Sequence, residues 1–295
     1  MPEGLAARSD DSYSRISVTP LAGALGAEIG GVDLTNLDDA TFEEVHRAWL
    51  DHHVIYFRDQ DMTPDDHLAF ARRWGEIHIH PFNKPMDGYP EILQLLKTET
   101  AERNNGNLWH SDQMYTAEPA KATILIAREM PPFGGDTMFT NQYLAYESLS
   151  DGMKAMLNRL KGVNDGNSRK NFRGKTRAEL QAAGQATTPQ KEPDPDVQTV
   201  SVHPLVRTHP ETGRKSLYVG AHTVQIDGMT EEESAPLLTY LMAHSSRPEF
   251  TCRVRWRVGT LTMWDNRCCQ HYALNDYQGV RRCVHKITVK GDKPF

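Results

Sequence analysis

The sequence predicts a mainly β protein with flanking helices, folded as a jelly-roll barrel. Many short segments rich in β-branched and aromatic residues recur along the 295 residues, separated by glycine, proline or polar turns. Helical patterns appear only near the start and in a few connections, and no internal repeat is visible. Residues 15–295 are therefore expected to form one domain, preceded by a disordered tail of small and charged residues at 1–14.

The first 75 residues contain the clearest local signals. After short strands within 16–32, apolar residues recur at helical spacing over 37–52, and a buried strand is expected at 54–57. Thr63-Pro64-Asp65-Asp66 then begins a second helix, which is expected to end at Gly75. The threonine supplies the N-cap, the proline fits the first turn, and the carboxylates lie at the positive end of the helix dipole.

The rest of the chain returns repeatedly to strand-like segments. The expected strands are 89–97, 123–128, 137–139, 205–206, 216–219, 249–256, 260–264 and 282–289. The expected helices are 142–160, broken near 150–152, and 230–244, which opens with a capping box. Residues 164–200 are polar and rich in glycine and proline, with one amphipathic piece at 176–183, so we predict an active-site lid or insertion there.

Composition and charge limit the kinds of molecule that the protein is expected to bind. The formal net charge of −6 lacks the basic excess that phosphate binding requires, so no nucleic-acid partner is expected. No apolar run reaches membrane-spanning length, and the start of the chain lacks the pattern of a signal peptide. The four cysteines show no C-x-x-C spacing and are expected to be reduced, as in a cytoplasmic protein. A monomer and a homo-oligomer are both compatible with the sequence.

The segment from Leu108 to Tyr115 carries the strongest chemical pattern. In a β-strand, residues two apart share one face, so His110 and Asp112 would aim an imidazole nitrogen and a carboxylate oxygen at one point. Such a pair suits Fe(II), and one further histidine would complete a 2-His-1-carboxylate face with open coordination positions. The pattern alone is short, and without further agreement along the chain two polar residues at a strand end would be the better explanation.

The second half of the chain supplies further polar residues. His271 follows a predicted strand, far along the chain from His110. Arg282 and Lys286 stand in the last predicted strand and, being four apart, share one of its faces. His78 and His80 are again two apart, but histidines at a strand edge more often serve packing or substrate contact than metal binding.

These motifs, in this order and spacing, resemble the Fe(II)- and 2-oxoglutarate-dependent taurine dioxygenase family, which includes the aryloxyalkanoate dioxygenases. The resemblance covers nearly the whole chain. The segments that carry it are 21–29, Trp109-His110-Ser111-Asp112, Gly134-Gly135-Asp136-Thr137, 203–210, Trp264-Asp265-Asn266-Arg267, His271-Tyr272-Ala273 and 291–295. It implies a double-stranded β-helix form of the jelly roll, with Fe(II) as cofactor and 2-oxoglutarate and O2 as cosubstrates.

The resemblance also implies roles for single residues. His110, Asp112 and His271 would bind the iron, and Thr137 and Arg282 would hold the distal carboxylate of 2-oxoglutarate. The chemistry agrees, because a guanidinium matches a carboxylate with two parallel hydrogen bonds and a hydroxyl can donate a third.

At some of the positions that bind the substrate in the family, this chain has different residues. The family places an arginine where Lys286 stands, and the position of His80 faces the anionic head of the substrate. His222 falls where the taurine enzyme has a pocket phenylalanine, and Asn171 and Phe172 would lie in the mobile loop nearby.

We therefore expect a small anionic substrate, a sulfonate, a carboxylate such as an aryloxyalkanoate, or a sulfate ester, held by Lys286 and His80. Hydroxylation of a carbon that bears sulfur, oxygen or nitrogen would be followed by spontaneous fragmentation. Alternatively, Lys286 bonds a nearby carboxylate and the pocket is neutral.

Two other classes of protein stay open on the sequence. A zinc-dependent hydrolase could use His110, Asp112 and His271 with a bound water, but it would have no need of Thr137 and Arg282. A non-catalytic jelly-roll binding protein would need no metal-binding triad at all.

Overall fold

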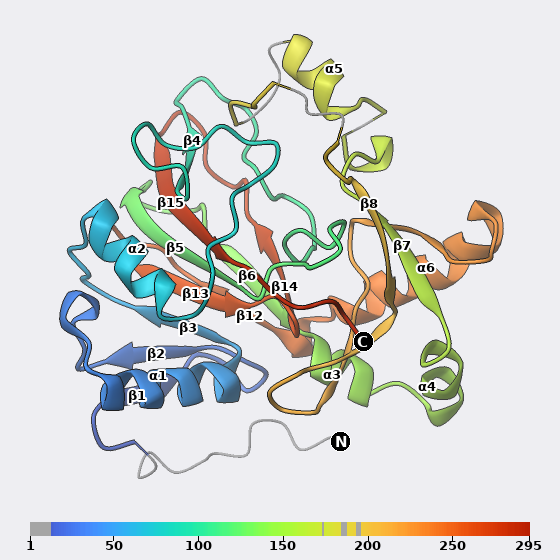
Figure 1. The fold of residues 1–295 in the computed structure, drawn as a ribbon, viewed down its shortest axis with the longest axis horizontal. Helices are drawn as coiled ribbons and strands as arrows, with labels where there is room; N and C mark the ends of the chain where they lie inside the picture. Colours follow the sequence, from blue (N-terminus) through green and yellow to red (C-terminus); the bar gives the residue numbers. More distant parts are fainter. Residues whose placement is uncertain (1–12, 173, 184–187, 193–195) are drawn as a thin grey trace.

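Two facing sheets form the barrel in the computed structural model, which describes residues 13–172, 174–183, 188–192 and 196–295 (Figure 1). The larger sheet has the strand order β1 (Ser17–Pro20), β2 (Ala27–Gly30), β3 (Val54–Phe57), β13 (Leu261–Asp265), β5 (Ala122–Glu129), β15 (Arg282–Val289) and β4 (Leu93–Lys97). The smaller sheet has the order β12 (Thr251–Val254), β6 (Thr137–Asn141) and β14 (Cys269–Ala273). Neighbouring strands are antiparallel except for the pair β2 and β3.

The central strands of the larger sheet are buried on both faces, which explains the apolar runs of β3 and β5. Along β5, Ile124 and Ile126 pack against helices α1 (Asp39–His52) and α2 (Pro64–Arg72), which cover the outer face of the sheet (Figure 1). Leu125 and Ala127 alternate with them and join the core inside the barrel. A side chain on this inner face therefore points toward the smaller sheet.

The predicted helices are present, with caps at their expected starts, but α2 ends at Arg72 rather than at Gly75 and the stretch expected to reach residue 160 ends at Leu157. Asp38 caps α1, and Thr63 and Asp66 form a capping box at the start of α2. The predicted break near residue 150 separates α3 (Gln142–Glu147) from α4 (Asp151–Leu157), and Ser150 caps the second piece. Helix α6 (Glu231–Ser245) begins at the expected capping box. None of the described helices combines the length and the apolar character needed to cross a membrane.

Smaller elements flank the barrel. Strands β11 (Thr223–Ile226), β7 (Lys161–Asp165) and β8 (Val200–Pro204) form one three-stranded sheet, and β9 (Val206–Thr208) and β10 (Lys215–Leu217) form a hairpin. The 3-10 helices are η2 (Leu34–Asn36), η3 (Arg169–Phe172) and η4 (Pro248–Phe250), and α5 (Arg177–Ala182) is the amphipathic piece expected near 176–183. The four cysteines are free and buried.

Several expectations about strands differ from the structure: β7, β8 and β11 were not predicted, and the strand expected at 89–97 begins only at Leu93. The expected strand at 249–256 opens as η4 and becomes regular only in β12. Strand β14 was not predicted, so His271 lies within a strand rather than after one. Residues 108–115 do not form a strand: His110 makes a single bridge to His271, and the chain then turns, with Gln113 in the left-handed region at φ 58°.

The described residues of the segment at 164–200 contain few regular elements. Its described residues 188–191 meet the loop at 82–84, where Lys84 donates a backbone hydrogen bond to Pro189 and Lys191 donates one to Phe82. The Lys191 ammonium also donates to the backbone carbonyl of His80 at 2.8 Å. The tail predicted at 1–14 lies outside the described residues except for its last two.

Candidate functional site

His110, Asp112 and His271 meet where the loop at 108–115 reaches β14. Each offers a ligand atom, and these atoms all lie within 4.8 Å of one another. The loop is fixed to the strand by two backbone hydrogen bonds, His110 N to His271 O at 3.2 Å and His271 N to His110 O at 2.8 Å. The following turn brings Asp112 Oδ1 to 3.8 Å from His110 Nε2. A bridge and a turn thus produce the convergence that strand alternation was expected to give.

The protonation of the two imidazoles suits metal binding. His110 Nδ1 lies 2.7 Å from the carbonyl oxygen of Leu108. Because a carbonyl only accepts, Nδ1 carries the hydrogen, and Nε2 is the nitrogen left to offer a lone pair to a metal. Burial lowers the pKa of His271 well below its ordinary value, so this imidazole is neutral.

The carboxylate of Asp112 is ionised and oriented. Its Oδ2 accepts from Thr123 Oγ1 at 2.6 Å and lies 2.8 Å from the Lys286 ammonium. Burial opposes the charge of the carboxylate, but the Lys286 ammonium holds the pKa of Asp112 below its usual range. Two imidazole nitrogens and one carboxylate are the donor set that suits Fe(II) with open positions, so these residues fit that ion.

A second group, His209, Asp265 and Cys268, also has ligand atoms within 4.8 Å of one another. Both oxygens of Asp265 are already occupied, because His209 Nε2 lies 2.9 Å from Oδ2 and Arg267 donates to both oxygens at 2.8 and 2.7 Å. We interpret this group as a buried ion-pair network that anchors the chain just before β14. His78 and His80 belong to neither metal-like group among the described residues.

Thr137 and Arg282, the residues predicted for 2-oxoglutarate, come together around Trp256. The Trp256 indole N–H donates to Thr137 Oγ1 at 3.0 Å, which leaves the threonine hydrogen free for another acceptor. The Arg282 guanidinium is buried, lies over the Trp256 ring at 5.7 Å, and donates from Nε to Gly135 O at 3.2 Å. The geometry therefore places a cation and a hydroxyl donor against the same indole side chain.

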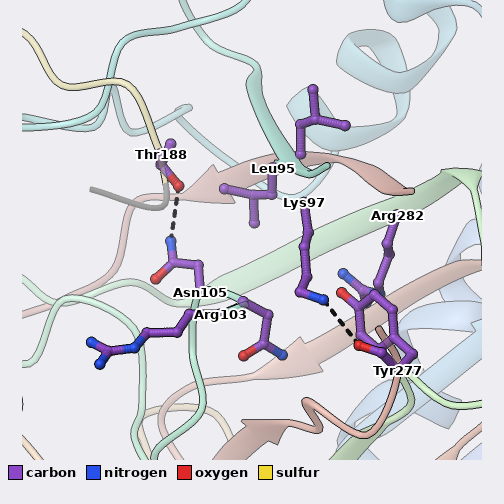
Figure 2. A pocket seen from close by; sticks show the side chains of 9 residues that line it. Leu95, Lys97, Arg103, Asn105, Thr188, Tyr277 and Arg282 are labelled. Atoms are coloured by element: carbon purple, nitrogen blue, oxygen red, sulfur yellow. Dashed lines mark hydrogen bonds between the residues drawn. The ribbon is translucent and has the colours of Figure 1, made fainter. Parts of the chain in front are cut away.

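A cavity opens beside Arg282, and Lys97 and Tyr277 are among the residues that line it (Figure 2). Lys97 is paired with Arg282 across β4 and β15, and its ammonium donates to the Tyr277 carbonyl at 2.9 Å. A Cβ at Gly135 would lie 3.1 Å from the Tyr277 ring and 3.2 Å from the Arg282 side chain, which explains the Gly-Gly turn. Sequence reasoning missed Lys97, because its position opposite Arg282 depends on strand register.

The structure brings only some of the residues predicted to bind the substrate close to the triad. Lys286 contacts Asp112, as described above, and the His222 ring lies 5.9 Å from the His110 ring. His80 Nδ1 accepts from the backbone N–H groups of Phe82 and Asn83, at 3.1 Å each. Asn171 lies in η3 with its Nδ2 buried and unpaired among the described residues. The side chain of Phe172 lies outside the described part of the structure.

A row of aromatic rings joins His80 to the triad. Its members in order are His80, Phe82, Tyr115, His222 and His110, with neighbouring centroids 6.0, 5.9, 5.1 and 5.9 Å apart. Phe82 and Tyr115 were not singled out in the sequence, although Tyr115 ends the central motif. Ring contacts therefore connect the segment that carries His80 to the triad.

The chain matches the family described as taurine catabolism dioxygenase TauD, TfdA family, over residues 17–288. The chain belongs to this family. It is 34% identical over 285 residues to an alpha-ketoglutarate-dependent sulfate ester dioxygenase of Pseudomonas putida, covering 95% of this chain and 91% of that protein. It is 31% identical over 287 residues to an (S)-phenoxypropionate/alpha-ketoglutarate-dioxygenase of Sphingobium herbicidovorans, covering 93% and 95%.

Solved structures agree with the family assignment. The crystal structure of a taurine dioxygenase from Burkholderia xenovorans has a TM-score of 0.78 and 35% identity, and the match covers 95% of this chain and 93% of that one. The predicted family, the jelly-roll fold and a dioxygenase that uses Fe(II), 2-oxoglutarate and O2 are thereby confirmed. The zinc hydrolase and the non-catalytic binding protein, which the sequence left open, find no support in these matches.

Proposed function

We propose that this dioxygenase binds Fe(II) through His110, Asp112 and His271 and hydroxylates a small anionic organic substrate at the expense of 2-oxoglutarate. The observation that carries the proposal is the convergence of the three ligand atoms within 4.8 Å, on a loop and a strand far apart in the sequence. The chemistry supplied by bound iron is the coupling of oxidative 2-oxoglutarate decarboxylation to substrate hydroxylation. Succinate formation that requires Fe(II), 2-oxoglutarate, O2 and substrate together tests this function.

The contribution of the chain to the cosubstrate is orientation. We propose that Arg282 binds the distal carboxylate of 2-oxoglutarate through its guanidinium while Thr137 donates the hydrogen that Trp256 leaves free. Burial of the guanidinium strengthens this charge-assisted contact, because little water competes for it. The two residues would direct the keto-acid end of the cosubstrate toward the triad.

The substrate class follows from the relatives and from the charges at the site. The named relatives act on a sulfate ester and on phenoxypropionate, and the solved structure is that of a taurine dioxygenase; all three substrates are small anions. We therefore propose a sulfate ester, a sulfonate or a carboxylate such as an aryloxyalkanoate, with its organic part against the row of aromatic rings. Hydroxylation next to the ester or ether oxygen gives a product that separates spontaneously into two fragments.

The anion is proposed to bind Lys286 with help from His80. In the structure Lys286 pairs with Asp112. This is the contact with a nearby carboxylate that the alternative, a neutral pocket, expects. We propose that the ammonium exchanges this partner for an incoming anion, because a lysine carries its charge on a long side chain with several rotatable bonds. Burial and the charges of Lys290 and Lys286 lower the pKa of His78, so the segment that carries His80 lies within electrostatic range of Lys286.

Lys286→Met should remove coupled succinate release for anionic substrates only, because the thioether keeps the length of the side chain but not its charge. The measurement is a panel of alkyl sulfates, sulfonates and aryloxyalkanoates with neutral analogues of similar shape. Lys290→Met is the matched control, since this exposed lysine just after β15 pairs with Glu76 on the surface. Equal turnover of the anions by the parent and Lys286→Met would refute the anion site.

We also propose that residues 15–295 act as one domain in which 164–200 form a lid. The contacts of residues 188–191 with the loop at 82–84 and with the backbone carbonyl of His80 support this, because His80 and Phe82 begin the row of aromatic rings. Limited proteolysis should then cleave within 164–200 more slowly in the presence of Mn(II), 2-oxoglutarate and a substrate. An unchanged cleavage rate would argue against closure over the site.

A further inference from the structure

We propose that Thr123 is a positioning residue that holds one oxygen of Asp112, so that the other oxygen alone faces the two histidines. Thr123 lies on β5, in the middle of the larger sheet between β13 and β15, and is completely buried. Its hydroxyl lies 2.6 Å from Asp112 Oδ2, whereas Oδ1 is the oxygen that lies 3.8 Å from His110 Nε2. The proposal rests on the metal-binding role proposed for Asp112.

The direction of this hydrogen bond is fixed by Asn266. The amide oxygen of Asn266 accepts two N–H groups, Trp264 Nε1 and the backbone N of Asp112, at 3.0 Å each. Because both of these groups only donate, the amide cannot be reversed, and Asn266 Nδ2 donates to Thr123 Oγ1 at 2.9 Å. The hydroxyl hydrogen of Thr123 is therefore directed to Asp112 Oδ2.

Two donors, Lys286 and Thr123, thus share Asp112 Oδ2, and they differ in charge and in burial. Lys286 is a flexible, partly exposed cation that the proposed substrate anion would attract away from Asp112. Thr123 and Asn266 are fully enclosed, with 0% and 1% of their surface exposed, and belong to one connected network. Thr123 is therefore the donor that keeps Oδ2 engaged when Lys286 turns to a substrate.

The consequence concerns how many oxygens the carboxylate gives to a metal. A carboxylate binds through one oxygen or through both, and a 2-His-1-carboxylate site keeps three positions open only if one oxygen is used. A hydrogen bond to Oδ2 stabilises binding through Oδ1 alone. Thr123 would thus preserve the open positions without touching the metal, as residues behind metal ligands commonly do.

Thr123→Val tests this inference, because it replaces the hydroxyl by a methyl group of similar size. The Kd for Fe(II), measured anaerobically, should rise about 10- to 100-fold, and the visible charge-transfer absorption with 2-oxoglutarate should shift or weaken at saturation. Thr262→Val is the matched control. This threonine is equally buried, on neighbouring β13, but its hydroxyl has no hydrogen-bond partner among the described residues, so metal binding should not change.

Thr123→Ser and Thr123→Ala provide a second comparison if the valine variant does not fold. Both lack the methyl group, and only the serine keeps the hydroxyl, so serine should bind Fe(II) like the parent and alanine should not. Parent-like Kd and absorption in the alanine or valine variant would overturn the positioning role. The metal-binding proposal would fail separately, if Asp112→Ala itself bound Fe(II) like the parent.

Discussion

Alanine in place of His110, Asp112 or His271 is expected to abolish succinate formation while leaving the fold largely intact. Each change removes one of three donors at an open site, so the loss should exceed the roughly 10- to 100-fold typical of residues behind the ligands. Succinate release with excess Fe(II) is the measurement, with the thermal transition of the metal-free protein as the test of folding.

His46→Ala is the control for the loss of a histidine. This residue pairs with Glu211 at 2.9 Å, remote from the triad in the chain and in no metal-like group among the described residues, so activity should persist. Full turnover by the Asp112→Ala enzyme would refute the assignment of the triad.

The second large effect is expected at Arg282. Arg282→Ala should raise the 2-oxoglutarate concentration needed for half-maximal rate by about 10- to 100-fold, since a hydrogen bond to a charged group contributes roughly 1.5–3 kcal/mol. Arg281→Ala is a closely matched control, because the neighbouring arginine is exposed and pairs with Glu129 and Glu99 on the surface. An unchanged 2-oxoglutarate requirement in Arg282→Ala would place the carboxylate site elsewhere.

The sequence predicted those parts of the fold that depend on local signals. The caps at Thr63 and Thr230 located two helices because an N-cap hydroxyl and a following carboxylate act within one turn. Strand β14 has no comparable local pattern: its residues, Cys269–Ala273, are extended because they pair with β6 and with the bridge at His110. Elements defined by such long-range pairing cannot be found from periodicity alone.

The same distinction applies to the site. Resemblance to a family gave His110, Asp112 and His271, and the structure brings them together, although by a bridge and a turn rather than by a strand. Thr123 reads in the sequence as an ordinary strand residue, because its contact with Asp112 depends on the packing of the loop at 108–115 against the larger sheet. Lys286 was placed on the correct face, but its partner could not be known before the sheets were assembled.

The central claim is that one site binds Fe(II) through the triad and 2-oxoglutarate beside it. Anaerobic titration of the metal-free protein with Fe(II) and then 2-oxoglutarate tests this claim directly. We predict a weak visible absorption from charge transfer between Fe(II) and the chelating keto acid, saturating at one equivalent and absent in His271→Ala. Tight binding of both compounds without that absorption, or the same absorption in His271→Ala, would contradict it.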